Sequence, residues 1–214
     1  MSDVFLFTGP ETARQTILLA HGAGAPMDSD SMTLAAQSLA DAGFRVARFE
    51  FAYMRGRRTG GSRRPPPKAD LLQQEYRDAV DRLETRTPLI IGGKSMGGRI
   101  ASMIADDLYQ RKTIIGLLCL GYPFHPPAQP EKTRTQHLET LATPTLICQG
   151  TRDPFGTPLD VAGYRLSAQI DILWFEDGDH DLKPRQRISG LSVADHQRTV
   201  QEGVLAWASG LPVL

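Results

Sequence analysis

Short apolar runs alternate along the chain with stretches of helical periodicity, and this alternation limits the possible folds more than any other feature. The runs are bounded by Gly, Pro and Asp, which favour turns. Such alternation is typical of a mostly parallel sheet covered by helices on both faces. About seven strands are predicted, at 4–7, 16–20, 45–49, 89–92, 114–120, 145–149 and 171–175. Helices are predicted at 31–42, 71–84, 96–110, 158–166 and 193–208.

The composition excludes several classes of protein. The 214 residues suit one α/β domain spanning 1–214, and 24 basic residues balance 24 acidic ones, so no net charge favours nucleic acid or an acidic membrane. No apolar run reaches the roughly 18 residues of a membrane span, and the first residues lack the pattern of a secretory signal. Cys119 and Cys148 lie in apolar runs, which predicts free buried thiols and a cytoplasmic location. The oligomeric state is not predicted.

A glycine-rich turn joins the predicted strand at 89–92 to the helix that follows it. In LIIGGKSMGGRIA, the residues Gly93, Ser95 and Gly97 match G-x-S-x-G at a strand–turn–helix junction. Such a turn strains the serine and lifts its hydroxyl above the sheet, while the glycines avoid collisions with strand and helix. The five residues alone also fit a turn without chemistry, but their context favours Ser95 as a nucleophile.

A second glycine-containing loop, HGAG, follows the predicted strand at 16–20. The oxyanion formed when a serine attacks an acyl group needs two backbone N–H donors, one from the residue after the serine and one from an earlier loop. We therefore predict Met96 as the first donor and Ala23, with Gly22 as the next choice, as the second. His21 precedes the nucleophile in the chain, so we interpret it as a residue that holds this loop.

An acid and a histidine follow the nucleophile on two later loops, in the order that this arrangement requires. Asp153 comes just after the predicted strand at 145–149, and His180 just after the strand at 171–175. Because the carboxyl ends of parallel strands meet at one edge of a sheet, we expect both side chains near Ser95. His180 would accept the serine proton, and Asp153 would fix the tautomer of the imidazole.

Other titratable residues have simpler interpretations. His125, His137 and His196 are interpreted as surface polar residues. Four acidic residues lie close to His180 in the sequence: Glu176, Asp177, Asp179 and Asp181. Such a cluster is also compatible with a metal site, but no second His or Cys lies at ligand spacing. No metal and no cofactor are predicted.

A basic segment, MRGRRTGGSRRPPPK at 54–68, contains six positive residues and three consecutive prolines, which predicts an extended loop. It is either a solvated surface loop or a wall of the site. In the second case Arg57 and Arg58, together with Arg63 and Arg64, would attract an anionic leaving group of the substrate.

The segment at 124–137 follows the predicted strand at 114–120, where a lid would be inserted. It is short, so we expect a minimal lid. Tyr122, just before this segment, is predicted to contact the substrate.

Together these motifs resemble the α/β-hydrolase-like family that includes testis-expressed protein thirty and regulatory subunit three of the NSL chromatin complex. The resemblance covers nearly the whole chain and rests on LLAHGAG, FEFAYMRGRRTGGSRRPPP, GGKSMGGRIAS, LGYPFHPP, PEKTRTQHL, QGTRDPFG and DGDHDLKPR. It implies an α/β-hydrolase fold with an intact triad at Ser95, Asp153 and His180. The chain is also similar to dienelactone-hydrolase-like proteins, although Ser95 stands where they carry cysteine, which argues against their particular activity.

The sequence thus predicts a serine hydrolase that cleaves a small ester through an acyl-enzyme on Ser95. A thioesterase or an acyltransferase would use the same residues, and the sequence does not separate these activities. The contrasting hypothesis is a non-catalytic protein-interaction module, because some relatives serve in protein complexes. The expected partner is a small-molecule ester or acyl substrate, with no nucleic acid and no membrane.

Overall fold

The computed structural model describes residues 5–58, 60–61 and 65–212, except for the side chain of Arg58. Within these residues seven strands form one sheet in the order β1-β3-β2-β4-β5-β6-β7. β1 (Phe5–Thr8) pairs antiparallel with β3 (Arg45–Phe49), and the other neighbouring strands are parallel. The remaining strands are β2 (Thr16–Ala20), β4 (Leu89–Lys94), β5 (Gly116–Leu120), β6 (Thr145–Gly150) and β7 (Ile170–Phe175). The prediction of a mostly parallel sheet is confirmed.

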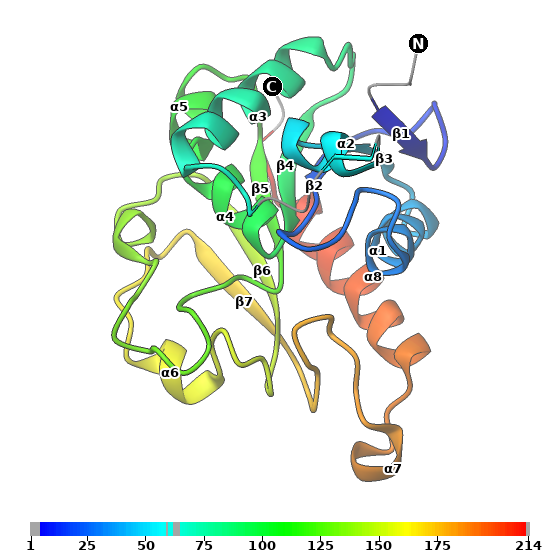
Figure 1. Cartoon of the computed structure of the whole chain (residues 1–214). Helices are drawn as coiled ribbons and strands as arrows, with labels where there is room; N and C mark the ends of the chain where they lie inside the picture. Colours follow the sequence, from blue (N-terminus) through cyan, green and yellow to red (C-terminus); the bar gives the residue numbers. More distant parts are fainter. Residues whose placement is uncertain (1–4, 59, 62–64, 213–214) are drawn as a thin grey trace.

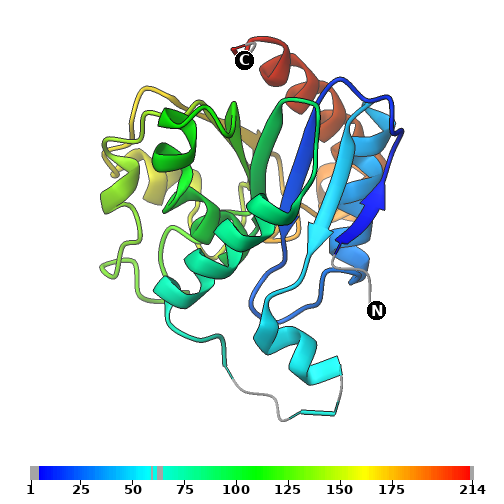
Figure 2. The same ribbon diagram turned by 90° about the horizontal axis from the view of Figure 1, so that it is seen from above.

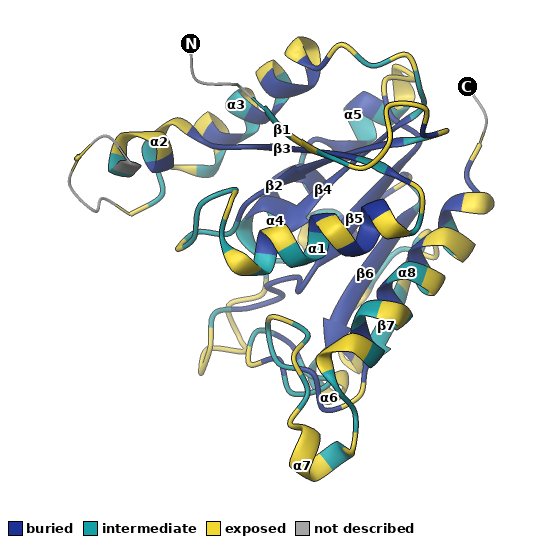
Figure 3. Cartoon of the chain, turned by 90° about the vertical axis from the view of Figure 1, so that its right-hand side faces the viewer, coloured by how far each residue is buried: buried dark blue, intermediate teal, exposed yellow. Residues whose placement is uncertain are grey.

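Helices cover both faces of this sheet (Figures 1 and 2). One face carries α1 (Asp30–Asp41) and α8 (Val193–Ser209), and the other carries α3 (Ala69–Arg82), α4 (Met96–Ser102) and α5 (Ala105–Gln110). The inner strands supply apolar side chains to both layers in alternation, so β2, β4, β5 and β6 are buried throughout, while the edge strands β1 and β7 are partly exposed and the helices expose their outer faces (Figure 3).

The alternation is clear in β2. Ile17 and Leu19 belong to the hydrophobic cluster under α1 and α8, whereas Leu18 packs with Tyr76 of α3 in the opposite cluster. Each such fully buried side chain contributes about 1.5–3 kcal/mol of hydrophobic free energy. Continuous apolar strands of this kind require helices on both faces, as the sequence predicts.

The ends of the parallel strands place the candidate residues at one edge of the sheet. β4 ends directly before Ser95, β6 ends three residues before Asp153, and β7 ends five residues before His180. Because β4, β5, β6 and β7 are consecutive parallel neighbours, these three loops leave the sheet on the same side.

The basic segment contains a helix, so the prediction that all of 54–68 is an extended loop is wrong. α2 (Ala52–Arg58) covers its first residues. The carbonyl of Phe51 accepts the first two backbone hydrogen bonds of this helix, at 3.0 and 3.2 Å, and Glu75 of α3 accepts from the N–H of Ala52 at 2.6 Å. Met54 is buried. The carboxylate of Glu75 at its N-terminus and the buried side chain of Met54 therefore stabilise this short helix before Gly60 and the prolines.

The helix predicted at 96–110 is divided into α4 and α5. The hydroxyl of Ser102, the last residue of α4, donates to the carbonyl of Arg99 at 2.7 Å, and Ile104 has a non-helical φ of −117°. A serine hydroxyl that bonds the preceding turn competes with the helix for that carbonyl, which accounts for the break.

Three shorter segments complete the chain. α6 (Pro158–Ala162) ends four residues before the predicted end of this helix, and Gly163 is its C-cap. The segment predicted as a minimal lid holds only a 3₁₀ turn, η1 (Gln136–Leu138). α7 (Gln186–Ser189) was not predicted, because it buries no residue and so leaves no periodic pattern. No helix in the described ranges is both long and apolar enough to cross a membrane.

The two cysteines are free and buried, as predicted. Cys119 lies on β5 and Cys148 on the neighbouring β6. Burial raises the pKa of the Cys148 thiol to about 12, so it stays uncharged at neutral pH.

Candidate active site

Ser95 occupies the turn between β4 and α4 in a strained conformation. Its φ is 51° and its ψ is −117°, whereas a residue with a side chain ordinarily has a negative φ. Such a conformation costs on the order of 1–3 kcal/mol and persists only where its surroundings enforce it. Here the N–H of Ser95 donates to the carbonyl of Leu120 on β5 at 3.0 Å, and its carbonyl accepts from the N–H of Arg99 at 3.0 Å.

The glycines on either side of Ser95 are required by close backbone contacts. A Cβ atom on either Gly93 or Gly97 would lie 2.4 Å from the carbonyl oxygen of Ala20. No real Cβ approaches an oxygen so closely, so β2, β4 and α4 meet at this point only because both residues lack side chains. The close approach of these backbones is the physical reason for glycine at both positions of the pattern, as the sequence predicts.

Asp153 and His180 meet in a partly buried hydrogen bond. His180 Nδ1 lies 2.8 Å from Asp153 Oδ2, and Asp153 is fully buried. The same oxygen accepts from Gln149 Nε2 at 2.9 Å, and Oδ1 accepts from the N–H of Phe155 at 2.9 Å. Both carboxylate oxygens are therefore occupied by donors, which assigns the proton to His180 Nδ1 and leaves its Nε2 as the acceptor of the neutral ring.

Two neighbours hold the imidazole ring in place. The rings of Phe155 and His180 lie 4.4 Å apart between centroids, at an angle of 35°. Gly121 lies beside the ring with a φ of 66°, and a Cβ there would be 2.7 Å from the carbonyl of His180 and 3.3 Å from its Nδ1. The His180 side chain is still 24% exposed. The ring is thus fixed by contacts while part of it stays open to solvent.

His21 is buried and fixes the loop that follows β2. Its Nε2 accepts from the N–H of Phe51 at 3.2 Å, so its Nδ1 carries the proton and donates to the carbonyl of Gly22 at 2.6 Å. Both ring nitrogens are thereby occupied by the backbone. This geometry agrees with the interpretation of His21 as a loop-holding residue.

The predicted oxyanion donors lie around the turn at Ser95. Met96 is the first residue of α4, so its N–H has no carbonyl partner within the helix. A Cβ on Gly22 would lie 3.7 Å from the Cβ of Ser95, which places the HGAG loop against the turn. Tyr53 of α2 donates its hydroxyl to the carbonyl of Ala23 at 3.1 Å. Burial raises the pKa of Tyr53 to about 12, so the hydroxyl remains a donor.

The basic segment adjoins this loop through Arg57. Its guanidinium carbon lies 5.2 Å from the centroid of the Tyr53 ring, within the range of a cation–π contact. Arg58 closes α2, and its side chain lies outside the described atoms. Arg63 and Arg64 also lie outside the described residues. Substrate binding by Arg57 and Arg58 therefore stays a prediction.

Tyr122 does not line a substrate surface, so its predicted contact is wrong. Its side chain is fully buried, and its hydroxyl donates to the carbonyl of Arg134 at 3.1 Å. Its backbone N–H donates to Gln149 Oε1 at 2.7 Å. Because Gln149 also donates to Asp153, Tyr122 supports the acid from within the core. Sequence reasoning missed Gln149, although a buried amide at the end of the apolar strand TLICQG needs polar partners.

The other histidines are not surface residues, which corrects their interpretation. His125 and His196 are buried, and in each the Nδ1 atom lies within 2.8 Å of a loop carbonyl. His137 Nε2 lies 2.8 Å from the hydroxyl of Ser102, and burial lowers the pKa of this histidine to about 4. His137 and His196 thus each join a loop to a helix, whereas His125 bonds the carbonyl of the next residue in its own loop.

Three of the four acidic residues close to His180 have separate partners. Asp177 pairs with Arg185, Asp179 accepts from two backbone N–H groups of its own loop, and Asp181 pairs with Lys94. Within the described ranges, no three His, Cys, Asp or Glu side chains are grouped as metal ligands. Sequence reasoning also missed Lys94, which occupies the first unspecified position of G-x-S-x-G.

Comparison with known proteins agrees with this architecture. Residues 13–209 match the family model described as an alpha/beta hydrolase domain. An alpha-beta serine hydrolase homologue from Coxiella burnetii has a TM-score of 0.69 at 17% identity, over 94% of this chain and 89% of that one. Dienelactone hydrolase from Anabaena variabilis has a TM-score of 0.70 at 19% identity, over 98% and 92%. An α/β serine hydrolase without a lid from Xanthomonas campestris has a TM-score of 0.64 at 20% identity, over 98% and 90%. At these identities the structural likeness shows a shared fold.

Proposed function

The chain belongs to the alpha/beta hydrolase family, and on that basis we propose that it is a serine hydrolase cleaving a small carboxylic ester through an acyl-enzyme on Ser95. The observation that carries this proposal is the partly buried 2.8 Å contact between Asp153 and His180 at the same sheet edge as the strained Ser95. Structural frameworks do not require a nucleophile, a base and an acid to converge in this way.

The chemistry follows from these positions. His180 Nε2 takes the hydroxyl proton as Ser95 Oγ attacks the ester carbonyl, and the N–H groups of Met96 and Ala23 stabilise the oxyanion. The C–O bond to the alcohol then breaks, and His180 returns the proton to the leaving oxygen. Water repeats the sequence on the acyl-enzyme and releases the acid. Asp153 holds the imidazole tautomer throughout.

We further propose a cytoplasmic enzyme. It needs no cofactor, because Ser95 supplies the nucleophile and His180 carries out the proton transfers while Asp153 orients it. A small-molecule substrate, rather than nucleic acid or a membrane, is consistent with the equal numbers of basic and acidic residues. Within the family, the motifs named above favour the group of testis-expressed protein thirty and the NSL subunit. A thioesterase or an acyltransferase remains the alternative that shares this machinery.

The test is hydrolysis of p-nitrophenyl esters from acetate to decanoate by the wild type and by Ser95→Ala. We expect the substitution to abolish turnover and labelling by a fluorophosphonate probe, while the chain-length optimum measures the acyl pocket. Ser209→Ala, at the end of α8, is the matched control and should keep both activities. A folded wild type that neither turns over an ester nor reacts with the probe would refute the proposal and favour a non-catalytic interaction module.

A further inference from the structure

Lys94 connects the nucleophile turn to the loop of the histidine. It is the last residue of β4, directly before Ser95, and is only 8% exposed. Its Nζ donates to the carbonyl of His180 at 2.6 Å and lies 3.0 Å from Asp181 Oδ1. One side chain thus reaches both the backbone of the candidate base and the carboxylate that follows it, 86 residues further along the chain.

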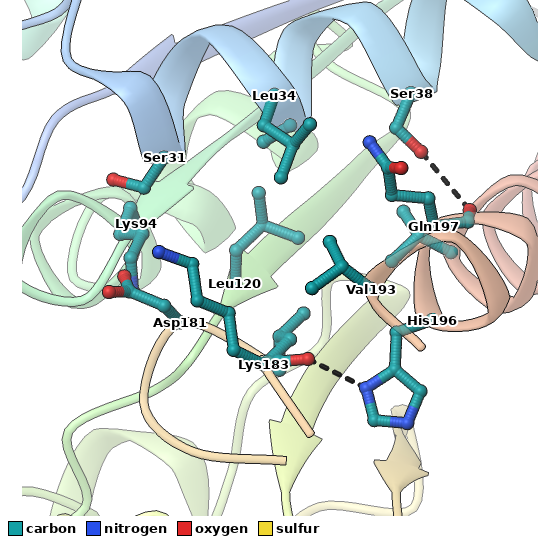
Figure 4. Close-up of a pocket in the computed structure, with 13 residues that line it drawn as sticks. Ser31, Leu34, Ser38, Lys94, Leu120, Asp181, Lys183, Val193, His196 and Gln197 are labelled. Carbon is teal, nitrogen blue, oxygen red and sulfur yellow. Dashed lines mark hydrogen bonds and ion pairs between the residues drawn. The ribbon is translucent and has the colours of Figure 1, made fainter. Parts of the chain in front are cut away.

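The ion pair forms part of a pocket on the α1 and α8 face of the sheet, behind the turn (Figure 4). Apolar and polar side chains of α1, β5 and α8 complete its lining, among them Leu34, Leu120 and Val193. An ammonium group in such surroundings needs a partner, because desolvation disfavours an isolated charge. Asp181 provides that partner and keeps the Lys94 charge next to the histidine loop.

The histidine loop is held by its own bonds and by bonds to two other elements. The N–H of Arg152 donates to the carbonyl of Gly178 at 2.9 Å, and His196 Nδ1 of α8 lies 2.6 Å from the carbonyl of Leu182. Asp179 Oδ1 accepts from the N–H groups of Asp181 and Lys183 at 2.8 and 2.9 Å, and the N–H of Asp179 donates to the carbonyl of Lys183 at 3.1 Å. Together these bonds make the loop a compact turn and attach it to the loop after β6 and to α8, but among the described residues none of them reaches β4. The contacts of Lys94 attach the loop directly to β4, whose backbone continues into Ser95.

We propose that Lys94 is a positioning residue that sets the separation between Ser95 and His180. The inference rests on the proposed hydrolase function. A general base must lie within about 2.6–3.2 Å of the heavy atom whose proton it takes, and an error near 1 Å costs about 100-fold in rate. Asp153 fixes the imidazole through its ring nitrogen, and Lys94 fixes the same residue through its carbonyl. Two anchors at opposite ends of His180 determine both the position and the direction of the ring.

The pocket provides a matched control. Lys183 lines the same pocket and belongs to the same loop, but no hydrogen bond or ion pair of its side chain occurs within the described part of the chain (Figure 4). Lys94→Met and Lys183→Met therefore remove the same chemical group from the lining of one pocket, where Lys94 is buried and Lys183 is exposed. Only Lys94→Met removes a hydrogen bond between β4 and His180.

The experiment measures kcat and KM for p-nitrophenyl butyrate, together with the rate of fluorophosphonate labelling. Lys94→Met should lower kcat and the labelling rate about 10- to 100-fold while KM changes less than about twofold. Lys94→Arg keeps the charge and the donors, so we expect it to recover much of the lost rate. Lys183→Met should behave as the wild type. A kcat for Lys94→Met equal to that of Lys183→Met would overturn the proposal.

The double variant Lys94→Met with Asp181→Asn separates positioning from charge burial. The double variant has no unpaired carboxylate at position 181. It can therefore be measured in place of Lys94→Met if that single variant does not fold. We expect the kcat of the double variant to stay low, because the bond to the His180 carbonyl is still absent. Recovery to wild-type kcat would mean that the stranded charge of Asp181, and not lost positioning, caused the defect. A wild type inert toward esters and probe defeats the proposed function, and this inference with it. An active wild type with unaffected Lys94 variants defeats the inference alone.

Discussion

Replacing Asp153 by asparagine preserves the shape of the buried acid but removes one of its two acceptor oxygens. The carboxylate meets His180 Nδ1 and Gln149 Nε2 at one oxygen and the N–H of Phe155 at the other. An asparagine that keeps its oxygen toward His180 turns its NH₂ group toward the N–H of Phe155. The reverse orientation turns that NH₂ group toward both His180 and Gln149. Every orientation therefore sets donor against donor in a fully buried site.

The first orientation is the less costly, because it leaves one donor unsatisfied instead of two. One unsatisfied buried donor costs about 1–3 kcal/mol, which for a domain of this size lowers Tm by about 2–12 °C. The loss of rate should be larger than this cost suggests. A neutral amide no longer stabilises the imidazolium formed during proton transfer, and any population of the reverse orientation reverses the tautomer. We expect kcat to fall about 10²- to 10⁴-fold, by analogy with the same substitution in serine proteases.

Ester kinetics and urea unfolding of Asp153→Asn measure the two effects on the same sample. Asp171→Asn, an exposed substitution on β7, controls for the loss of one carboxylate and should change neither quantity measurably. The reasoning fails if Asp153→Asn retains kcat within tenfold of the wild type. In that case the carboxylate would not orient the histidine during the reaction, whatever its geometry in the resting protein.

Two further predictions concern stability. Tyr76→Phe should lower the free energy of unfolding by about 1–3 kcal/mol in urea melts, because the buried hydroxyl bonds carbonyls of β2 and β4 and accepts one N–H of β4. Tyr109→Phe, whose hydroxyl has no hydrogen bond within the described ranges, should change it little, and equal effects would contradict the argument. For Asp177, the bonds from Arg185 hold the pKa at about 2, below the ordinary value of 3.8. This stabilisation is complete above about pH 4 and is lost as the pH falls toward 2. Urea midpoints should therefore drop more steeply over that interval in the wild type than in Asp177→Asn, and parallel curves would refute the assignment.

The sequence predicted the parts of the molecule that depend on chain order and repeating patterns. Apolar strands without alternation required helices on both faces, and G-x-S-x-G between strand and helix required the turn at Ser95. Asp153 and His180 could be chosen because each follows a strand at the same edge. Contacts that depend on the reach of a long side chain left no such pattern. Lys94 occupies an unspecified position of its motif, and its partners are 86 and 87 residues away in the sequence.

The error at Tyr122 and the placement of His180 have one backbone cause. Gly121 directly follows β5 and has a φ of 66°, a conformation that residues with side chains rarely adopt, and the chain after it carries Tyr122 into the core. The absent Cβ leaves room for the histidine, since a methyl group there would lie 2.7 Å from the carbonyl of His180. Position after a strand suggested that Tyr122 faces the substrate, but position does not reveal the sign of φ. The glycine before the tyrosine was the one sequence feature that indicated this turn. A glycine at the end of a strand often marks a place where another group approaches the backbone closely.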